Sequence, residues 1–177
     1  MANTTLSRTR EAIASIVAKA IVTPDQDAVI CEVQVAAPPE RIFQALTSED
    51  QLMRWWNGEG GPCRVRKWEM DARLGGKWRC QIHDPSGKVM PDGSAEFDNH
   101  GEIVEFDPPR VLAYSWYAGF HAIPRHRSLV RWELIPKGNG TLVKMTHSAL
   151  KDLPGGTGYA EGWPGVLDWL QKFAEGN

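Results

Sequence analysis

Most of the chain between residues 28 and 147 alternates apolar and polar side chains with a period of two. This pattern is typical of strands that bury one face. In the first such segment, residues 28–36, Val29, Cys31 and Val33 fall on one side. The same alternation predicts further strands at residues 63–70, 77–83, 94–106, 111–117, 129–135 and 141–147. Turns rich in glycine and proline separate these segments, so we expect consecutive strands to pair antiparallel.

Helical spacing of apolar residues appears in three places outside these strands. A short helix is expected over residues 40–46, and a second begins at Ser48. A long closing helix follows from the apolar positions between Trp163 and Phe173. Pro164 leaves the start of that helix open, either at Tyr159 or at the proline itself.

The N-terminal segment forms a separate unit in this interpretation. Apolar steps over residues 7–22 predict an amphipathic helix that Pro24 ends. We therefore divide the chain into an N-terminal helical extension, residues 1–24, and a domain, residues 25–177. A secretory signal is disfavoured because Lys19 interrupts a short apolar stretch, and an Arg-rich transit peptide is a second alternative. The favoured interpretation docks the helix on the domain or on a second copy, which would make a homodimer.

Composition narrows the class of protein. The chain has 177 residues, enough for one domain, and 42% of them are hydrophobic, which argues against disorder. Twenty Lys and Arg residues against 22 Asp and Glu give a net charge of −2, so we expect no nucleic-acid partner. No apolar run reaches the roughly 20 residues of a membrane span. The 3 cysteines are an odd, sparse set, which indicates buried thiols and a cytoplasmic location.

The order of the elements indicates the fold class. Helices that stand outside a run of antiparallel strands are typical of α+β proteins. We expect a curved antiparallel sheet wrapped around the long C-terminal helix, with the two short helices after the first strand and an extra N-terminal helix. A concave space between sheet and helix is a place where small ligands bind.

Several motifs appear in an order that is found in a known family. They are VAAPPERIF at 35–43, RWW at 54–56, DARLGGKW at 71–78, GEIVE at 101–105, PPRVL at 108–112 and LVKMTH at 142–147. Together they resemble the helix-grip (START-like, SRPBCC) proteins, and more narrowly the family of the activator of heat-shock protein 90 ATPase, C-terminal domain type. The resemblance covers residues 28–175. It implies a helix-grip fold in proteins that bind apolar ligands, act as cyclases or contact a chaperone.

Motifs for metal or cofactor chemistry are weak. His121 and His126 are five residues apart with no cysteine or histidine cluster near them, so we expect no metal site. We also expect no cofactor, because the glycine-rich segment at residues 155–158 lacks the GKS or GKT ending of a phosphate loop. We interpret Gly155, Gly156 and Gly158 instead as the hinge of a lid formed by the last helix.

The 8 tryptophans suggest the function. Aromatic and polar side chains on inward strand positions predict a ligand cavity lined by Trp56, Trp78, Trp116, Trp132, Met145 and His147. Our first hypothesis is the binding of a small hydrophobic or aromatic ligand in this cavity, without catalysis. One alternative is a chaperone-interacting domain similar to an ATPase activator. The other is a cyclase or hydrolase that uses His147 or Glu105 as acid or base.

Overall fold

The computed structural model of the protein describes residues 18–58, 60–123 and 125–176. Its strands are β1 (Lys19–Val22), β2 (Val29–Val35), β3 (Arg64–Met70), β4 (Lys77–His83), β5 (Glu96–Asp107), β6 (Val111–Ala118), β7 (Ser128–Lys137) and β8 (Gly140–Ser148). Its helices are α1 (Pro39–Thr47), α2 (Glu49–Trp55) and α3 (Tyr159–Glu175), with the 3-10 turn η1 (Gly156–Gly158) directly before α3. The strands form one antiparallel sheet in the order β1-β2-β8-β7-β6-β5-β4-β3.

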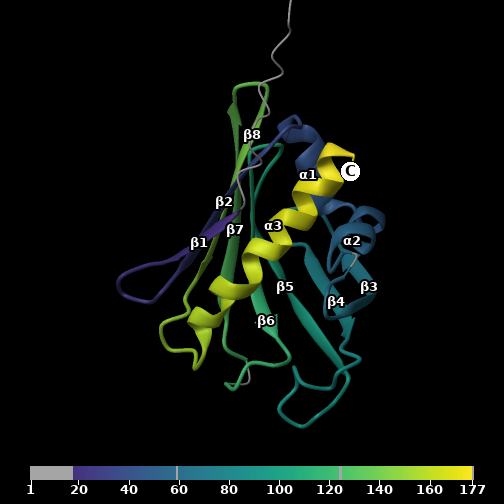
Figure 1. Cartoon of the computed structure of the whole chain (residues 1–177), viewed down its shortest axis with the longest axis vertical. Helices are drawn as coiled ribbons and strands as arrows, with labels where there is room; N and C mark the ends of the chain where they lie inside the picture. The colour runs from purple at the N-terminus through teal and green to yellow at the C-terminus, as the bar shows by residue number, and fades with distance from the viewer. Residues whose placement is uncertain (1–17, 59, 124, 177) are drawn as a thin grey trace, which may run out of the picture.

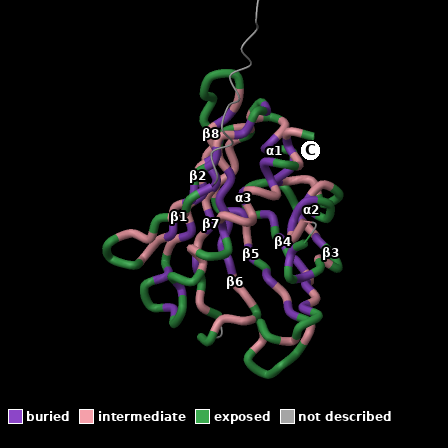
Figure 2. The backbone as a smooth tube through the Cα atoms, in the orientation of Figure 1, coloured by how far each residue is buried: buried purple, intermediate pink, exposed green. Residues whose placement is uncertain are grey.

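The sheet curves around α3, and α1 and α2 cover one end of this arrangement (Figure 1). The predicted α+β helix-grip architecture is therefore confirmed. Buried positions alternate with exposed ones along the strands, and the connecting loops are largely exposed (Figure 2). In β8, for example, Val143, Met145 and His147 are fully buried while their neighbours are partly exposed. The period of two in the sequence thus corresponds to one face turned toward α3.

The N-terminal prediction is wrong at its end. The sequence pattern predicts helix through residue 22, but Lys19–Val22 forms β1, which pairs antiparallel with β2 from Lys19 opposite Glu32 to Val22 opposite Val29. Without β1, this side of β2 would present unpaired backbone groups, and pairing satisfies them. Residues 1–17 lie outside the described residues, and they include most of the predicted N-terminal helix.

Helix α3 begins at Tyr159, the earlier of the two starts considered, and Pro164 lies inside it. Its C-terminal end is hydrogen-bonded to β2 and to the residue that follows it. The Gln171 side chain donates a hydrogen bond to the Gln34 carbonyl oxygen at 2.8 Å. The Ala36 backbone N–H donates to the Glu175 carboxylate, also at 2.8 Å. These bonds hold the helix across the concave face of the sheet.

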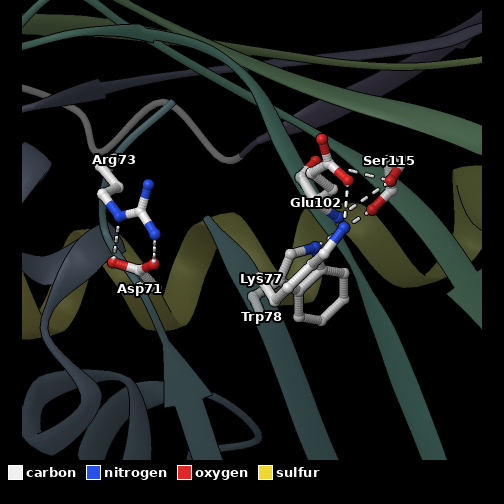
Figure 3. Close-up of polar contacts among 6 residues, drawn as sticks. All are labelled: Asp71, Arg73, Lys77, Trp78, Glu102 and Ser115. Carbon is white, nitrogen blue, oxygen red and sulfur yellow. Dashed lines mark hydrogen bonds and ion pairs between the residues drawn. The ribbon is translucent and has the colours of Figure 1, made fainter. Parts of the chain in front are cut away.

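A close approach between strands fixes one of the indoles. Trp78 on β4 is opposite Gly101 on β5, and its Nε1 donates a hydrogen bond to the Ser115 carbonyl oxygen of β6 at 3.1 Å (Figure 3). A Cβ at Gly101 would overlap that carbonyl oxygen and lie 2.6 Å from Trp78 Nε1. The ion pairs Lys77–Glu102 and Arg73–Asp71 lie at exposed positions nearby (Figure 3). Only a glycine at position 101 therefore leaves room for the Trp78 contact.

Candidate functional site

The structure brings together the six side chains that the sequence pattern selected for a cavity. They are Trp56, Trp78, Trp116, Trp132, Met145 and His147. Trp56 directly follows α2, and the other five lie on β4, β6, β7 and β8. None is more than 7% exposed, and all apart from His147 belong to the hydrophobic core.

The indole rings in this group pack directly on one another. The ring centroids of Trp78 and Trp116 are 5.0 Å apart, and those of Trp56 and Trp116 are 6.3 Å apart. From α3, Trp163 adds a ring 5.8 Å from that of Trp132 and 6.2 Å from that of Trp56. We call these five tryptophans the indole cluster. Its side chains fill space between the sheet and α3.

His147 is a hydrogen-bonded part of this interior. The Trp163 indole N–H donates to its Nδ1 at 3.1 Å, so Nδ1 accepts and Nε2 carries the proton. Nε2 then donates to the Ser128 hydroxyl at 2.8 Å, and that hydroxyl donates to the Trp116 carbonyl oxygen. Burial lowers the pKa of His147 to about 3, because the charged imidazolium would lose its hydration. The ring is therefore neutral at physiological pH.

The polar segment between β6 and β7 contacts the start of α3. The Trp116 indole N–H donates to the Tyr159 hydroxyl at 3.1 Å, and that hydroxyl lies 2.6 Å from His121 Nε2. His126 Nε2 donates to the Ala149 carbonyl oxygen at 2.7 Å. Burial, together with the neighbouring His126, lowers the pKa of His121 to about 4. The two histidines thus connect this segment to the chain around the start of α3.

Glu105 lies on the opposite face of the sheet from the indole cluster. This position contradicts the hypothesis that uses Glu105 as an interior acid or base. Its carboxylate pairs with the Arg131 guanidinium at 2.8 Å, and Arg131 alternates with the buried Trp132 along β7. Adjacent residues of a strand point to opposite faces, so this pair lies on the face of the sheet away from α3. The hydrogen bond from Arg131 lowers the pKa of Glu105. Glu105 is therefore an ionised partner in a surface ion pair.

The predicted hinge glycines adjoin the start of α3. Gly155 has a φ of 75°, a left-handed conformation that favours glycine. Gly156 is buried, and a Cβ there would come within 2.6 Å of the Leu150 carbonyl oxygen. Gly158 has open space around it. This close contact explains why position 156 is a glycine. The hinge role of the three glycines stays a prediction.

A cleft of about 370 Å³ reaches the indole cluster from the surface. We call it the Trp56 cleft. It is lined by Met53, Arg54, Trp56, Asn57, Gly58, Gly60, Arg64 and Val65. These residues belong to the end of α2, the segment after it and the start of β3. Trp56 lines the cleft and also contacts Trp116 and Trp163, so it separates the surface from the interior.

Sequence reasoning identified only one residue of this cleft, Trp56. Arg54 precedes it by two positions, and Arg64 opens the strand β3, but neither position alone suggests a shared hollow. It also missed Ser128 and Tyr159, which complete the hydrogen bonds of the interior. A signal for Tyr159 existed, because it lies four residues before Trp163 on the same helical face.

Two other kinds of feature are absent from the described residues. No group of three or more His, Cys, Asp or Glu side chains there is arranged to hold a metal ion. No helix of this part of the chain combines the length and the apolar character that a membrane crossing requires.

Comparisons with known proteins agree with the architecture. A family model described as activator of Hsp90 ATPase homolog 1-like protein matches residues 36–175. A crystal structure from Chromobacterium violaceum is similar with a TM-score of 0.68 and 23% identity, covering 84% of this chain and 97% of that chain. The solution structure of an AHSA1-like protein from Aeromonas hydrophila has a TM-score of 0.66 and 20% identity, covering 84% and 92%. Identities at this level show the fold alone, and no curated protein matches with statistical significance.

Proposed function

Because the chain belongs to the family of activator of Hsp90 ATPase homolog 1-like proteins, we propose that it uses the helix-grip fold to bind a small apolar or aromatic ligand. The ligand enters the Trp56 cleft and extends toward the indole cluster between the sheet and α3. Binding without chemical turnover is the proposed activity.

The observation that carries this proposal is that Trp56, a side chain only 7% exposed, lines the cleft and also contacts the interior rings. The cleft volume of about 370 Å³ lies within the range of small-molecule sites. Met53 and Val65 add apolar surface beside the indole, and aromatic faces favour stacked or edge-on aromatic ligands. Rotation of the Trp56 side chain would let a ligand reach the rings of Trp116 and Trp163, which it now contacts.

The hydrogen bonds of His147 favour binding over acid–base catalysis. Both ring nitrogens already have partners, Trp163 on one side and Ser128 on the other. With a pKa of about 3, the ring is a poor base at neutral pH, since a useful catalytic pKa lies near the operating pH. His147 therefore supports the site as a neutral, fixed side chain.

A fluorescence titration with N-phenyl-1-naphthylamine, a neutral aromatic probe, tests the proposal. We expect saturable binding to the full chain and a blue-shifted probe emission. Val65→Asn should weaken this binding about 10-fold, because it replaces an apolar wall of the cleft with an amide, and tenfold in Kd corresponds to about 1.4 kcal/mol.

Val104→Asn is the matched control, because Val104 is also a strand valine, is 37% exposed and lies outside the lining of the Trp56 cleft. We expect it to bind the probe as the unmodified chain does. Absence of saturable binding, or equal weakening by both substitutions in folded protein, would overturn the proposal.

A further inference from the structure

We infer, building on the proposed binding function, that the ligand of the Trp56 cleft carries an oxyanion, a carboxylate or a phosphate, which Arg54 and Arg64 bind at the mouth of the cleft. The ligand class is thus an anionic amphiphile: an apolar or aromatic body that lies against Trp56 and a charged group that stays near solvent.

Arg64 is oriented by the backbone next to it. Its Nη1 donates hydrogen bonds to the carbonyl oxygens of Gly61 and Cys63, both at 3.0 Å. A guanidinium has five N–H donors in a planar fork, so donors on Nε and Nη2 remain for another acceptor. The two backbone carbonyl groups already restrain the Arg64 side chain. Binding an anion through Nε and Nη2 therefore loses less conformational entropy than it would with an unrestrained arginine.

Arg54 contributes a second guanidinium from the last turn of α2. Within the described residues, neither Arg54 nor Arg64 forms an ion pair with a carboxylate, whereas Arg73, which lies beyond the other end of β3, pairs with Asp71 at 2.7 Å. Glu59, which lies between two lining glycines in the sequence, is outside the described residues. Two cations that have no carboxylate partner among the described residues raise the local concentration of anions at this cleft.

The apolar and charged parts of the lining fix the orientation of the ligand. Trp56 is 7% exposed, whereas both arginines are exposed, so we assign the indole to the inner part of the cleft and the guanidinium groups to its mouth. A carboxylate or phosphate bound to guanidinium keeps some of its hydration at the rim, and charge-assisted hydrogen bonds are stronger than neutral ones. The apolar body is then directed inward, toward the indole cluster.

The test compares two fluorescent probes with almost the same aromatic body. N-phenyl-1-naphthylamine is neutral, and 8-anilino-1-naphthalenesulfonate carries a sulfonate. We expect the sulfonate probe to bind the full chain at least about 10-fold more tightly at low ionic strength, and high salt to reduce this preference. Arg54→Gln and Arg64→Gln should each weaken binding of the sulfonate probe several-fold more than binding of the neutral probe.

Arg73→Gln is the matched control, since it removes an exposed arginine that does not line the cleft. We expect it to leave both probes unchanged. Displacement of the sulfonate probe by 2-naphthoate or by 2-naphthyl phosphate then identifies the preferred oxyanion, and displacement by either one supports the inference. Circular dichroism confirms that each variant is folded.

Three results would overturn the inference. One is equal affinity for the two probes with no effect of either cleft substitution, which leaves the proposed function standing. Another is equal loss in the Arg73 control, which assigns the effect to overall charge. The last is failure of both naphthyl anions to displace the sulfonate probe. If the neutral probe shows no saturable binding, the proposed function itself fails.

Discussion

Acidification should destabilise the protein through His147 well before most carboxylates become protonated. In the folded state its pKa is about 3, because the ring is fully buried, and in an unfolded chain a histidine has a pKa of about 6.5. As the pH falls below 6.5, the unfolded chain binds a proton that the folded protein does not. The stability present above pH 6.5 is therefore lost as the pH falls toward 3.

The magnitude follows from how far the pH falls below the unfolded pKa of about 6.5 while the folded His147 stays neutral. One pKa unit is 1.36 kcal/mol, so between pH 7 and pH 5 the free energy of unfolding should fall by about 2 kcal/mol from His147 alone. His121, whose pKa is also lowered by burial, acts in the same direction. Tyr159, whose ring centroid lies 4.2 Å from that of His147, stays neutral over this range because burial raises its pKa.

Urea unfolding monitored by tryptophan fluorescence at pH 7 and pH 5 measures the effect. His147→Gln removes the titrating group, so we expect the variant to lose about 2 kcal/mol less than the unmodified chain between the two pH values. Its stability at pH 7 will be lower, but the comparison uses only the difference between pH values. His100→Gln is the control, because His100 is exposed on β5, and we expect it to keep the original difference.

The reasoning would be refuted if the unmodified chain and His147→Gln lost the same stability between pH 7 and pH 5. That result would mean that His147 takes up its proton in the folded protein as readily as in the unfolded chain. Desolvation of the ring would then be relieved by water or by movement of Trp163.

Three further substitutions test the packing. Gly101→Ala should lower the free energy of unfolding by about 1–3 kcal/mol, measured by thermal melting, because its Cβ would collide with the Ser115 carbonyl oxygen. Gly165→Ala should raise it by about 0.5–1 kcal/mol, since this glycine of α3 has open space around it; a lower melting temperature would contradict this. Trp163→Phe should lower the free energy of unfolding by about 1–3 kcal/mol. It should also raise the pKa of His147 in an NMR titration, because Nδ1 of the neutral ring loses its hydrogen-bond donor; an unchanged pKa would contradict this.

The central part of the fold was predictable because each strand between β2 and β8 buries one face. The period of two then appears directly in the sequence, and β4 was predicted with the bounds it has in the structure. The prediction failed at β1. Over four residues a helical period and a period of two are hard to distinguish, and the outcome there depends on pairing with β2, which is a non-local contact.

The candidate site was less predictable than the fold. Strand alternation placed Trp116 and His147 on the inward face, but it could not show that the indoles contact one another, because ring packing depends on the curvature of the sheet. The hydrogen bond from Trp163 to His147 joins a helix to a strand and leaves no local signal. Arg54 and Arg64 line the same cleft because of the path that the chain takes between α2 and β3, and the sequence pattern does not reveal that path.

Helix α3 is held at both of its ends, and this restricts how the protein can admit a guest molecule. Tyr159 is secured at one end by Trp116 and His121, and Gln171 and Glu175 at the other end by the chain around β2. Displacing α3 would break these hydrogen bonds, whereas the Trp56 side chain can rotate without breaking any of them. We therefore expect a guest molecule to enter beside the helix, by rotation of Trp56, while α3 keeps its position.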